Sequence, residues 1–298
     1  MKVGDLTLEG FGRSLASDGV AIRFGPFISR IATTLPELAA PIKSLYSDFP
    51  LATEGLIDYH VAIRASSRWR YVFSPQAEFV VDGDVAFLPF DRPLALAFLE
   101  WGLNRCIYRN AHQFLIFHAA VVDRDGQALV LPGLPGSGKS TLCAALVNRG
   151  WRLLSDELTL VRPADGRLVS IARAVSLKDG SIQIIQEFAP DAVFGPRIEN
   201  THKGTIAHMC PPSDSVHRVD DLSKAAWIVF SRYGHEVETK LTPLAKARAF
   251  FHLADSSFNY DILGALGFRM TCDLVDTCDC YEFAYSSLDE AVVRLGDL

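Results

Sequence analysis

The sequence has no apolar run long enough to cross a membrane. A membrane-spanning helix needs about 18 apolar residues, and the nearest stretch, Pro93–Cys106, is interrupted by Glu100, Asn104 and Arg105. The first five residues, MKVGD, lack the apolar core of a signal peptide. We therefore expect a cytoplasmic protein with no membrane partner.

Excess positive charge and paired cysteines are also missing. The chain has 29 Lys and Arg against 35 Asp and Glu, a net charge of −6, which argues against a non-specific nucleic-acid binder. Cys272, Cys278 and Cys280 cluster near the C-terminus but form no C-x-x-C pair. We interpret them as core or strand thiols rather than zinc ligands, in a protein whose cysteines stay reduced. The chain also has no fixed repeat or low-complexity tract.

Apolar residues are plentiful. They make up 49% of 298 residues, with 21% charged residues, which excludes a disordered chain and allows about two domains. We expect an α+β N-terminal region over residues 1–110 and a second domain over 111–298. In the first, the patterns predict strands at Val20–Phe24, Tyr59–Ala65, Arg68–Ser74 and Glu78–Leu88, with a turn at 82–84, and helices at Leu35–Tyr46, interrupted by Pro41, and Leu94–Arg109.

The second region has the order of an α/β core. The predicted elements are a strand at Phe114–Val122 with a turn after it, a strand at Gln127–Leu131, a helix at Ser140–Asn148, a strand at Trp151–Leu154 and a hairpin of Leu158–Arg162 with Arg167–Ile171. Gly150 is placed to end the helix. A strand, a glycine-rich loop, a helix and another strand in this order predict an α/β fold.

The glycine-rich loop carries the clearest chemical signal. Its residues are Gly133, Leu134, Pro135, Gly136, Ser137, Gly138, Lys139 and Ser140, which match G-x-x-x-x-G-K-[ST] and precede Thr141. Glycines let the backbone N–H groups point inward around a polyphosphate, and the following helix adds its positive N-terminus. Lys139 can then reach the β- and γ-phosphates, and the Ser140 hydroxyl can bind Mg²⁺. The alternative is an ordinary glycine turn, which the strand before it and the helix after it disfavour.

Two acids follow the next predicted strand. Asp156 and Glu157 lie 17 and 18 residues after Lys139. We expect their strand to lie beside the one that feeds the loop, so that both carboxyl ends face one crevice. One carboxylate can then hold Mg²⁺ while the other takes a proton from an attacking hydroxyl. The alternative is a solvated acidic turn. His118 lies 21 residues before Lys139, where a lone histidine on an apolar strand is commonly a core residue.

These residues together resemble the kinase domain of bacterial HPr kinase/phosphorylase. The resemblance runs without gaps from His118 through Gly133–Ser140 to the segment RGWRLLSDE at 149–157. Downstream stretches resemble a divergent branch, the HPr-kinase-related kinases, and extend the resemblance over most of the chain. Those stretches are VSLK at 175–178, HKGT at 202–205, SFNY at 257–260 and CDCY at 278–281.

The resemblance implies a fold shared with phosphoenolpyruvate carboxykinases and the use of ATP and Mg²⁺. It makes Asp156 the proton-transferring carboxylate, Glu157 and Ser140 the Mg²⁺ contacts, and His118 a polar neighbour of the acid or the γ-phosphate. It also implies a homo-oligomeric, ring-like assembly. Glu157 stands where that family has a second Asp, and the family's later glutamate-containing, glycine-rich signature is missing. We therefore do not predict the reverse reaction, phosphorolysis.

The sequence thus predicts an ATP- and Mg²⁺-dependent kinase that phosphorylates a hydroxyl, and the acceptor we expect first is serine on a small protein or peptide. Two alternatives stay open, a kinase of small molecules and a nucleotide-binding regulator with little turnover. The intact set of Lys139, Ser140 and Asp156 favours chemistry over sensing. Lys178, Lys203 and Arg232 are candidate cations for the transferred phosphate, with surface ion pairing as the alternative. We expect residues 210–217 to form a loop.

Overall fold

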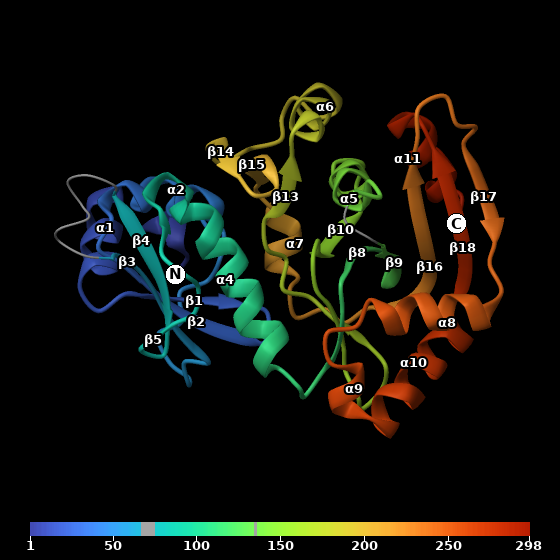
Figure 1. Ribbon diagram of the computed structural model, residues 1–298, viewed down its shortest axis with the longest axis horizontal. Coiled ribbons are helices and arrows are strands. Elements are labelled where there is room, and N and C mark those ends of the chain that lie inside the picture. The colour runs from blue at the N-terminus through green and yellow to red at the C-terminus, as the bar shows by residue number, and fades with distance from the viewer. Residues whose placement is uncertain (67–74, 134–135) are drawn as a thin grey trace.

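Two large sheets and two small ones organise the part of the chain that the computed structural model describes, residues 1–66, 75–133 and 136–298 (Figure 1). The protein is mixed α/β, with helices and strands alternating through most of its length. The predicted strand Arg68–Ser74 lies outside the described residues. Within them, no helix combines the length and the apolar character that crossing a bilayer requires.

The N-terminal region folds around one sheet in the order β1-β2-β3-β4-β5, with β6 also on β4. Its strands are β1 Val20–Phe24, β2 Phe27–Thr33, β3 Tyr59–Ala65, β4 Gln76–Val81, β5 Asp84–Val85 and β6 Phe90–Asp91. Its helical elements are η1 Val3–Asp5, α1 Leu8–Ala16, η2 Pro36–Leu38, α2 Ala39–Leu45, η3 Arg92–Leu94 and α4 Ala95–Asn110. Asp82 and Gly83 both have positive φ, 50° and 96°, between the paired β4 and β5, which confirms the predicted turn.

Pro41 does not interrupt its helix as the sequence predicted. The segment Leu35–Tyr46 becomes the short 3₁₀ turn η2 followed by α2, and Pro41 is the third residue of α2. Proline is tolerated in a first helical turn because the backbone N–H that it lacks would have no partner within the helix there. The helix instead changes type, from 3₁₀ to α, between Leu38 and Ala39, and both of these residues keep helical backbone angles.

The central sheet carries the glycine-rich loop. Its order is β10-β8-β9-β16-β18-β17. The strands are β8 Ala119–Arg124, β9 Gln127–Pro132, β10 Arg152–Ser155, β16 Lys224–Tyr233, β17 Lys240–Pro243 and β18 Asp279–Tyr285. β10 does not pair with β9 as predicted, because β8 lies between them. Since β8 is antiparallel to both, β9 and β10 still run the same way and end at the same edge.

The predicted strand Phe114–Val122 is two strands in two different sheets. β7, Leu115–Phe117, pairs with β11 in a three-stranded sheet, whereas β8 belongs to the central sheet. His118 lies at the break, and its backbone N–H donates to the carbonyl of Ser256 at 2.7 Å. The other two strands, β11 Thr159–Val161 and β12 Leu168–Val169, form the predicted hairpin.

Helices cover both faces of the central sheet. Leu129 and Leu131 on β9 face one core with α5 and α11, while Ala128 and Val130 face the other with α8 and α10. The helices after β9 are α5 Lys139–Val147, α6 Gly180–Phe188, α7 Ser213–His217, α8 Lys246–Asp255, α9 Tyr260–Leu263, α10 Ala265–Thr277 and α11 Leu288–Gly296. The loop predicted over 210–217 therefore contains a short helix, α7. Cys278 and Cys280 are buried in the second core, as the interpretation of core thiols expected.

The last small sheet joins the two halves of the chain. It has the order β13-β15-β14, formed by β13 Val175–Lys178, β14 Ile198–Thr201 and β15 Gly204–Met209. Ile198 and Ile206 of this sheet pack in the same core as the N-terminal sheet. Just before β13, the buried Arg173 guanidinium lies 2.5 Å from the Glu100 carboxylate of α4. A domain boundary near residue 110 stays a prediction, since this core includes residues from both sides of it.

Candidate functional site

Neighbouring strands brace the glycine-rich loop at Ser137 and Gly138, just before α5. Leu134 and Pro135 lie outside the described residues. Gly138 has φ 88°, and a Cβ there would stand 2.6 Å from the Tyr285 hydroxyl and 3.1 Å from the Tyr233 Cβ. The Tyr285 hydroxyl donates to the Gly138 carbonyl at 3.2 Å, and the Tyr233 N–H donates to the Ser137 carbonyl at 3.2 Å. Both the backbone angle and the close contact therefore demand glycine at this position.

A cavity of about 1040 Å³ opens at the edge where β9, β10, β16 and β18 end. Its lining joins the loop, the start of α5, His118, Glu157, β13, α6 and the β14–β15 turn with the ends of β16 and β18. In open α/β sheets, ligands bind outside the carboxyl ends of the strands. The cavity thus occupies the part of the fold where a ligand is expected.

The two acids after β10 have different environments. Glu157 lines the cavity, and its Oε2 lies 3.0 Å from His118 Nε2. Asp156 is 3% exposed, lies behind the lining, and accepts a hydrogen bond from the Ser176 N–H at 3.0 Å through Oδ2. The pair therefore presents one carboxylate to the cavity and holds the other directly beneath it.

The same difference separates their proton affinities. Burial, followed by the negative charge of Glu157, raises the pKa of Asp156 to about 7, although the Ser176 N–H and the Ser140 hydroxyl oppose the shift. Burial also works to raise the pKa of Glu157, but the hydrogen bond and charge of His118 bring that pKa below its usual value. When the pair carries one negative charge, that charge is therefore on Glu157, and Asp156 loses its proton only near neutral pH.

Lys139 and two buried oxygens without hydrogen-bond partners in the described part of the chain lie at this cavity. The lysine suits an anionic ligand, and the oxygens suit a ligand that donates hydrogen bonds or carries positive charge. Lys139 is 7% exposed and forms no ion pair within the described residues. Burial lowers the pKa of its ammonium, opposed by the charges of Glu157 and Asp156. In the same part of the chain, Ser137 Oγ and Asp156 Oδ1 are buried without a hydrogen-bond partner. Buried polar atoms without partners are uncommon in proteins and suit a missing ligand.

The donor set fits Mg²⁺ in company with a polyphosphate. The described residues contain no cluster of three or more His, Cys, Asp or Glu side chains that could enclose a metal ion by themselves. Mg²⁺ commonly binds through one or two carboxylates, a hydroxyl, water and substrate phosphates rather than in a protein cage. Ser140 and Glu157 both line the cavity, and Asp156 lies close enough to Ser140 for that hydroxyl to lower the pKa of Asp156.

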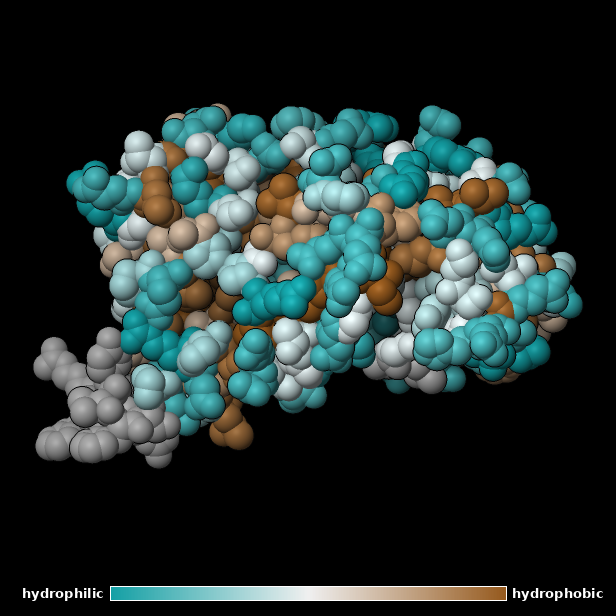
Figure 2. All heavy atoms as spheres, turned by 90° about the horizontal axis from the view of Figure 1, so that it is seen from above, coloured by the Kyte–Doolittle hydropathy of each residue, from teal (hydrophilic) through white to brown (hydrophobic). Residues whose placement is uncertain are grey.

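Apolar and aromatic side chains form the outer walls, and sequence reasoning missed them. Ile184 and Phe188 of α6 line one part, and Tyr233 and Tyr285 line another. The Arg149 guanidinium stacks 3.9 Å from the centre of the Phe188 ring. Seen from the side that carries α6, hydrophobic residues show between hydrophilic ones, mostly toward the middle of the face (Figure 2). No motif marks these residues, because α6 and the ends of β16 and β18 are far apart in the sequence and meet only in the folded chain.

The structure brings most sequence candidates to this one cavity. Its lining includes His118, Gly136, Gly138, Lys139, Ser140, Thr141, Glu157, Lys178 and Lys203. Ser137 and Asp156 have buried polar atoms just behind. Gly133 and Arg232 do not line it. Of the three candidate cations, Lys178 and Lys203 thus lie where a bound phosphate could meet them, and Arg232 does not.

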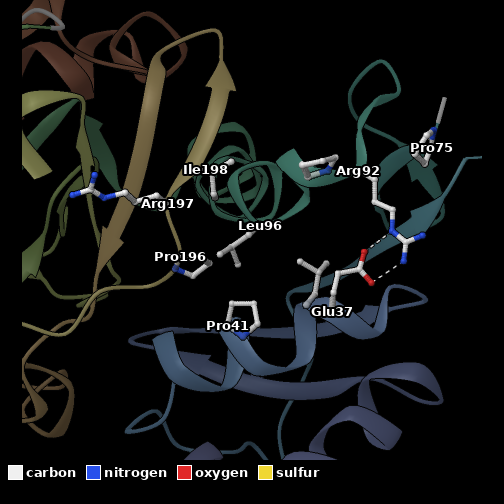
Figure 3. Close-up of a pocket in the computed structure, with 10 residues that line it drawn as sticks. Glu37, Pro41, Pro75, Arg92, Leu96, Pro196, Arg197 and Ile198 are labelled. Carbon is white, nitrogen blue, oxygen red and sulfur yellow. Dashed lines mark hydrogen bonds and ion pairs between the residues drawn. The ribbon is translucent and has the colours of Figure 1, made fainter.

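A second cavity, of about 400 Å³, lies where the N-terminal region meets β14. Pro41, Leu96, Pro196 and Ile198 surround it, and the side chain of Arg197 points away (Figure 3). At its edge Glu37 and Arg92 form an ion pair with each other. This cavity is largely apolar and lacks the lysine, hydroxyl and acid pair that the larger one brings together.

Comparisons with known proteins add little to this geometry. No protein-family model matches the chain, and no curated protein matches it. A search of solved structures finds the HPr(Ser) kinase/phosphatase from Coxiella burnetii, which is 14% identical, covers 61% of this chain and 95% of its own, and has a TM-score of 0.26. That score is too low to establish a common fold, so the function must be argued from this chain's own residues.

Proposed function

We propose that the protein is an ATP- and Mg²⁺-dependent kinase that transfers the γ-phosphate to a hydroxyl. The observation that carries the proposal is the convergence of Lys139, Ser140 and Glu157 on one cavity, with Asp156 beneath them. A phosphate loop with adjacent acids is the arrangement that phosphoryl transfer requires, because its catalysis rests on positioning and on charge stabilisation. Mg²⁺ bound with ATP would neutralise charge on the β- and γ-phosphates.

Lys139 binds the nucleotide in this proposal, and Lys178 and Lys203 act on the phosphoryl group that is transferred. Lys139 and the N–H groups at the start of α5 bind the β- and γ-phosphates, where the helix N-terminus adds positive charge. Lys203 acts electrostatically on Lys139 and Glu157, and Lys178 acts on Lys139. These two lysines therefore lie within range to stabilise charge that develops on the transferred phosphoryl group. The walls of Ile184, Phe188 and the two tyrosines suit the flat, apolar face of a nucleobase.

Asp156 accepts the proton of the attacking hydroxyl in this proposal, and Glu157 binds Mg²⁺. A pKa of about 7 suits Asp156 for general-base work at neutral pH. A metal ligand must be deprotonated, which suits the lowered pKa of Glu157. His118 holds the Glu157 carboxylate in place at 3.0 Å.

The opposite assignment is the second candidate, and one observation favours it. Glu157 lines the cavity, whereas Asp156 lies behind the lining beside Ser140. In this alternative Glu157 takes the proton with His118 beside it, and Asp156 supports the metal through Ser140. The two assignments differ in which variant excess Mg²⁺ can rescue, and that difference can be measured.

Serine on a small protein or peptide is the acceptor we propose, in the cytosol, with neither nucleic acid nor membrane as a partner and with the chain forming a homo-oligomer. The test is to incubate the purified protein with Mg²⁺, γ-labelled ATP and a cytosolic extract from cells that lack this protein. Label on a polypeptide that survives protein denaturation and hydrolyses to phosphoserine supports the proposal. Label on a metabolite supports a small-molecule kinase. ATP binding with no transfer supports a nucleotide-binding regulator.

A further inference from the structure

The turn between β14 and β15, residues 201–205, brings His202 and Lys203 to the cavity and is called the arm below. Thr201 Oγ1 donates to the Gly204 carbonyl at 2.6 Å and accepts from the Lys203 N–H at 3.0 Å. The Thr205 N–H donates to Asp179 Oδ1 at 3.0 Å. A Cβ on Gly204 would stand 2.3 Å from that same carboxylate oxygen. The arm is therefore fixed at its base, on the residue that precedes α6.

The tip of the arm rests on a side chain from the N-terminal region. Trp101 of α4 contacts the His202 ring edge-to-face, with ring centres 4.7 Å apart. The Lys203 Nζ lies 5.3 Å from the centre of the same indole. Both His202 and Lys203 line the cavity. Edge-to-face ring contacts and cation–π contacts are attractive and depend on orientation, so they restrict the positions of these two exposed side chains.

The helix that carries Trp101 is itself tied to the small sheet. Glu100, the residue before it, forms the buried ion pair with Arg173 at 2.5 Å. The other guanidinium nitrogen of Arg173 donates to Asn104 of the same helix at 2.6 Å. Arg173 lies two residues before β13, and β13 pairs with β15. These contacts therefore connect α4 to the small sheet that carries the β14–β15 turn.

We infer that Trp101 is a positioning residue of the kinase site: it holds the β14–β15 turn so that Lys203 meets the transferred phosphoryl group. The inference rests on the proposed function and gives the N-terminal region a part in catalysis. Trp101 itself touches no reacting atom. It acts by reducing the number of positions open to the Lys203 ammonium, so its removal should weaken transition-state stabilisation more than nucleotide binding.

The first measurement needs no catalysis. Amide hydrogen exchange on the nucleotide-free chain should show faster exchange at Lys203 and Thr205 in Trp101→Ala than in wild type, by about three- to tenfold. Trp101→Phe should recover most of the protection, because a ring still meets His202. Phe87→Ala is the matched control, since Phe87 packs on the same N-terminal core through Phe79 and Phe98 and, among the described residues, makes no ring contact with His202. Unchanged exchange at the turn in Trp101→Ala overturns the inference.

The second measurement is a double-mutant cycle on MgATP hydrolysis, with water as the acceptor, and on the Kd of a non-hydrolysable MgATP analogue. Trp101→Ala and Lys203→Ala should each lower kcat by about three- to thirtyfold and change Kd by less than about threefold. In the Lys203→Ala background, Trp101→Ala should then cost less than about twofold. Equal costs in both backgrounds mean a merely structural role and overturn the inference. If Lys139→Ala leaves the analogue Kd unchanged, the proposed function fails instead, and the exchange result still decides whether Trp101 holds the turn.

Discussion

Replacing the two acids one at a time should separate binding from chemistry. Asn at position 156 keeps the size of Asp, and its amide oxygen can still accept the Ser176 N–H that now donates at 3.0 Å. It cannot accept a proton at neutral pH. Positioned general-base catalysis contributes about 10²–10⁴ in rate, so we expect Asp156→Asn to lower kcat by that factor while the MgATP Kd changes by only a few fold.

Glu157→Gln should fail in a different way. It removes a charged ligand that the His118 contact holds at 3.0 Å, so Mg²⁺ binding should weaken and excess Mg²⁺ should restore part of the activity. The assay is label transfer from γ-labelled ATP, with ATP hydrolysis measured alongside, over a series of free Mg²⁺ concentrations. A thermal melt with and without MgATP shows whether each variant is folded. Near-normal kcat in Asp156→Asn refutes the assignment of the base, and Mg²⁺ rescue of Asp156→Asn but not of Glu157→Gln establishes the reverse one.

Three other changes test the glycine-rich loop, the buried carboxylate of Asp156 and the ion pair between Glu100 and Arg173. Gly138→Ala forces a Cβ to within 2.6 Å of the Tyr285 hydroxyl at φ 88°; strain of about 1–3 kcal/mol should weaken MgATP binding about tenfold by calorimetry, and an unchanged Kd would contradict the close fit. Without nucleotide, the folded chain holds the Asp156 proton more tightly than the unfolded chain does, so stability falls as pH rises between 3.8 and about 7. Asp156→Asn should remove that loss, which amounts to about 3 kcal/mol between pH 5 and pH 8, and melts at these two pH values with the same difference in both proteins would oppose it. Glu100→Ala leaves the Arg173 guanidinium buried without its ion-pair partner and should cost about 3–5 kcal/mol in urea unfolding, whereas a cost below about 1 kcal/mol would mean that water reaches the pair.

The sequence predicted the local parts of the site well. The helix after the loop begins at Lys139, and Gly150 follows its end with φ 93°, because caps and glycine turns are decided by neighbouring residues. The hairpin over 159–169 formed for the same reason. The signals that located these elements all lie within a few residues of them.

Features that depend on strand order were beyond the sequence. The insertion of β8 between β9 and β10, and the break at His118, are set by how distant strands pair. The Tyr285 brace on Gly138 joins residues 147 positions apart. Lys203 could be named as one cation among three, but its contact with Trp101 requires α4 to pack on the β14–β15 turn. No local pattern encodes that packing.

Nucleotide binding by Lys139 is the central claim, and one titration tests it. Lys139 is the buried cation of the phosphate loop, 7% exposed and with no ion-pair partner in the residues that the structure describes. A charge-assisted hydrogen bond is worth about 1.5–3 kcal/mol, so Lys139→Ala should weaken binding of a non-hydrolysable MgATP analogue at least about tenfold, measured by calorimetry on chains whose melting temperatures match. Wild-type affinity in Lys139→Ala would contradict the assignment of this loop as a phosphate-binding loop.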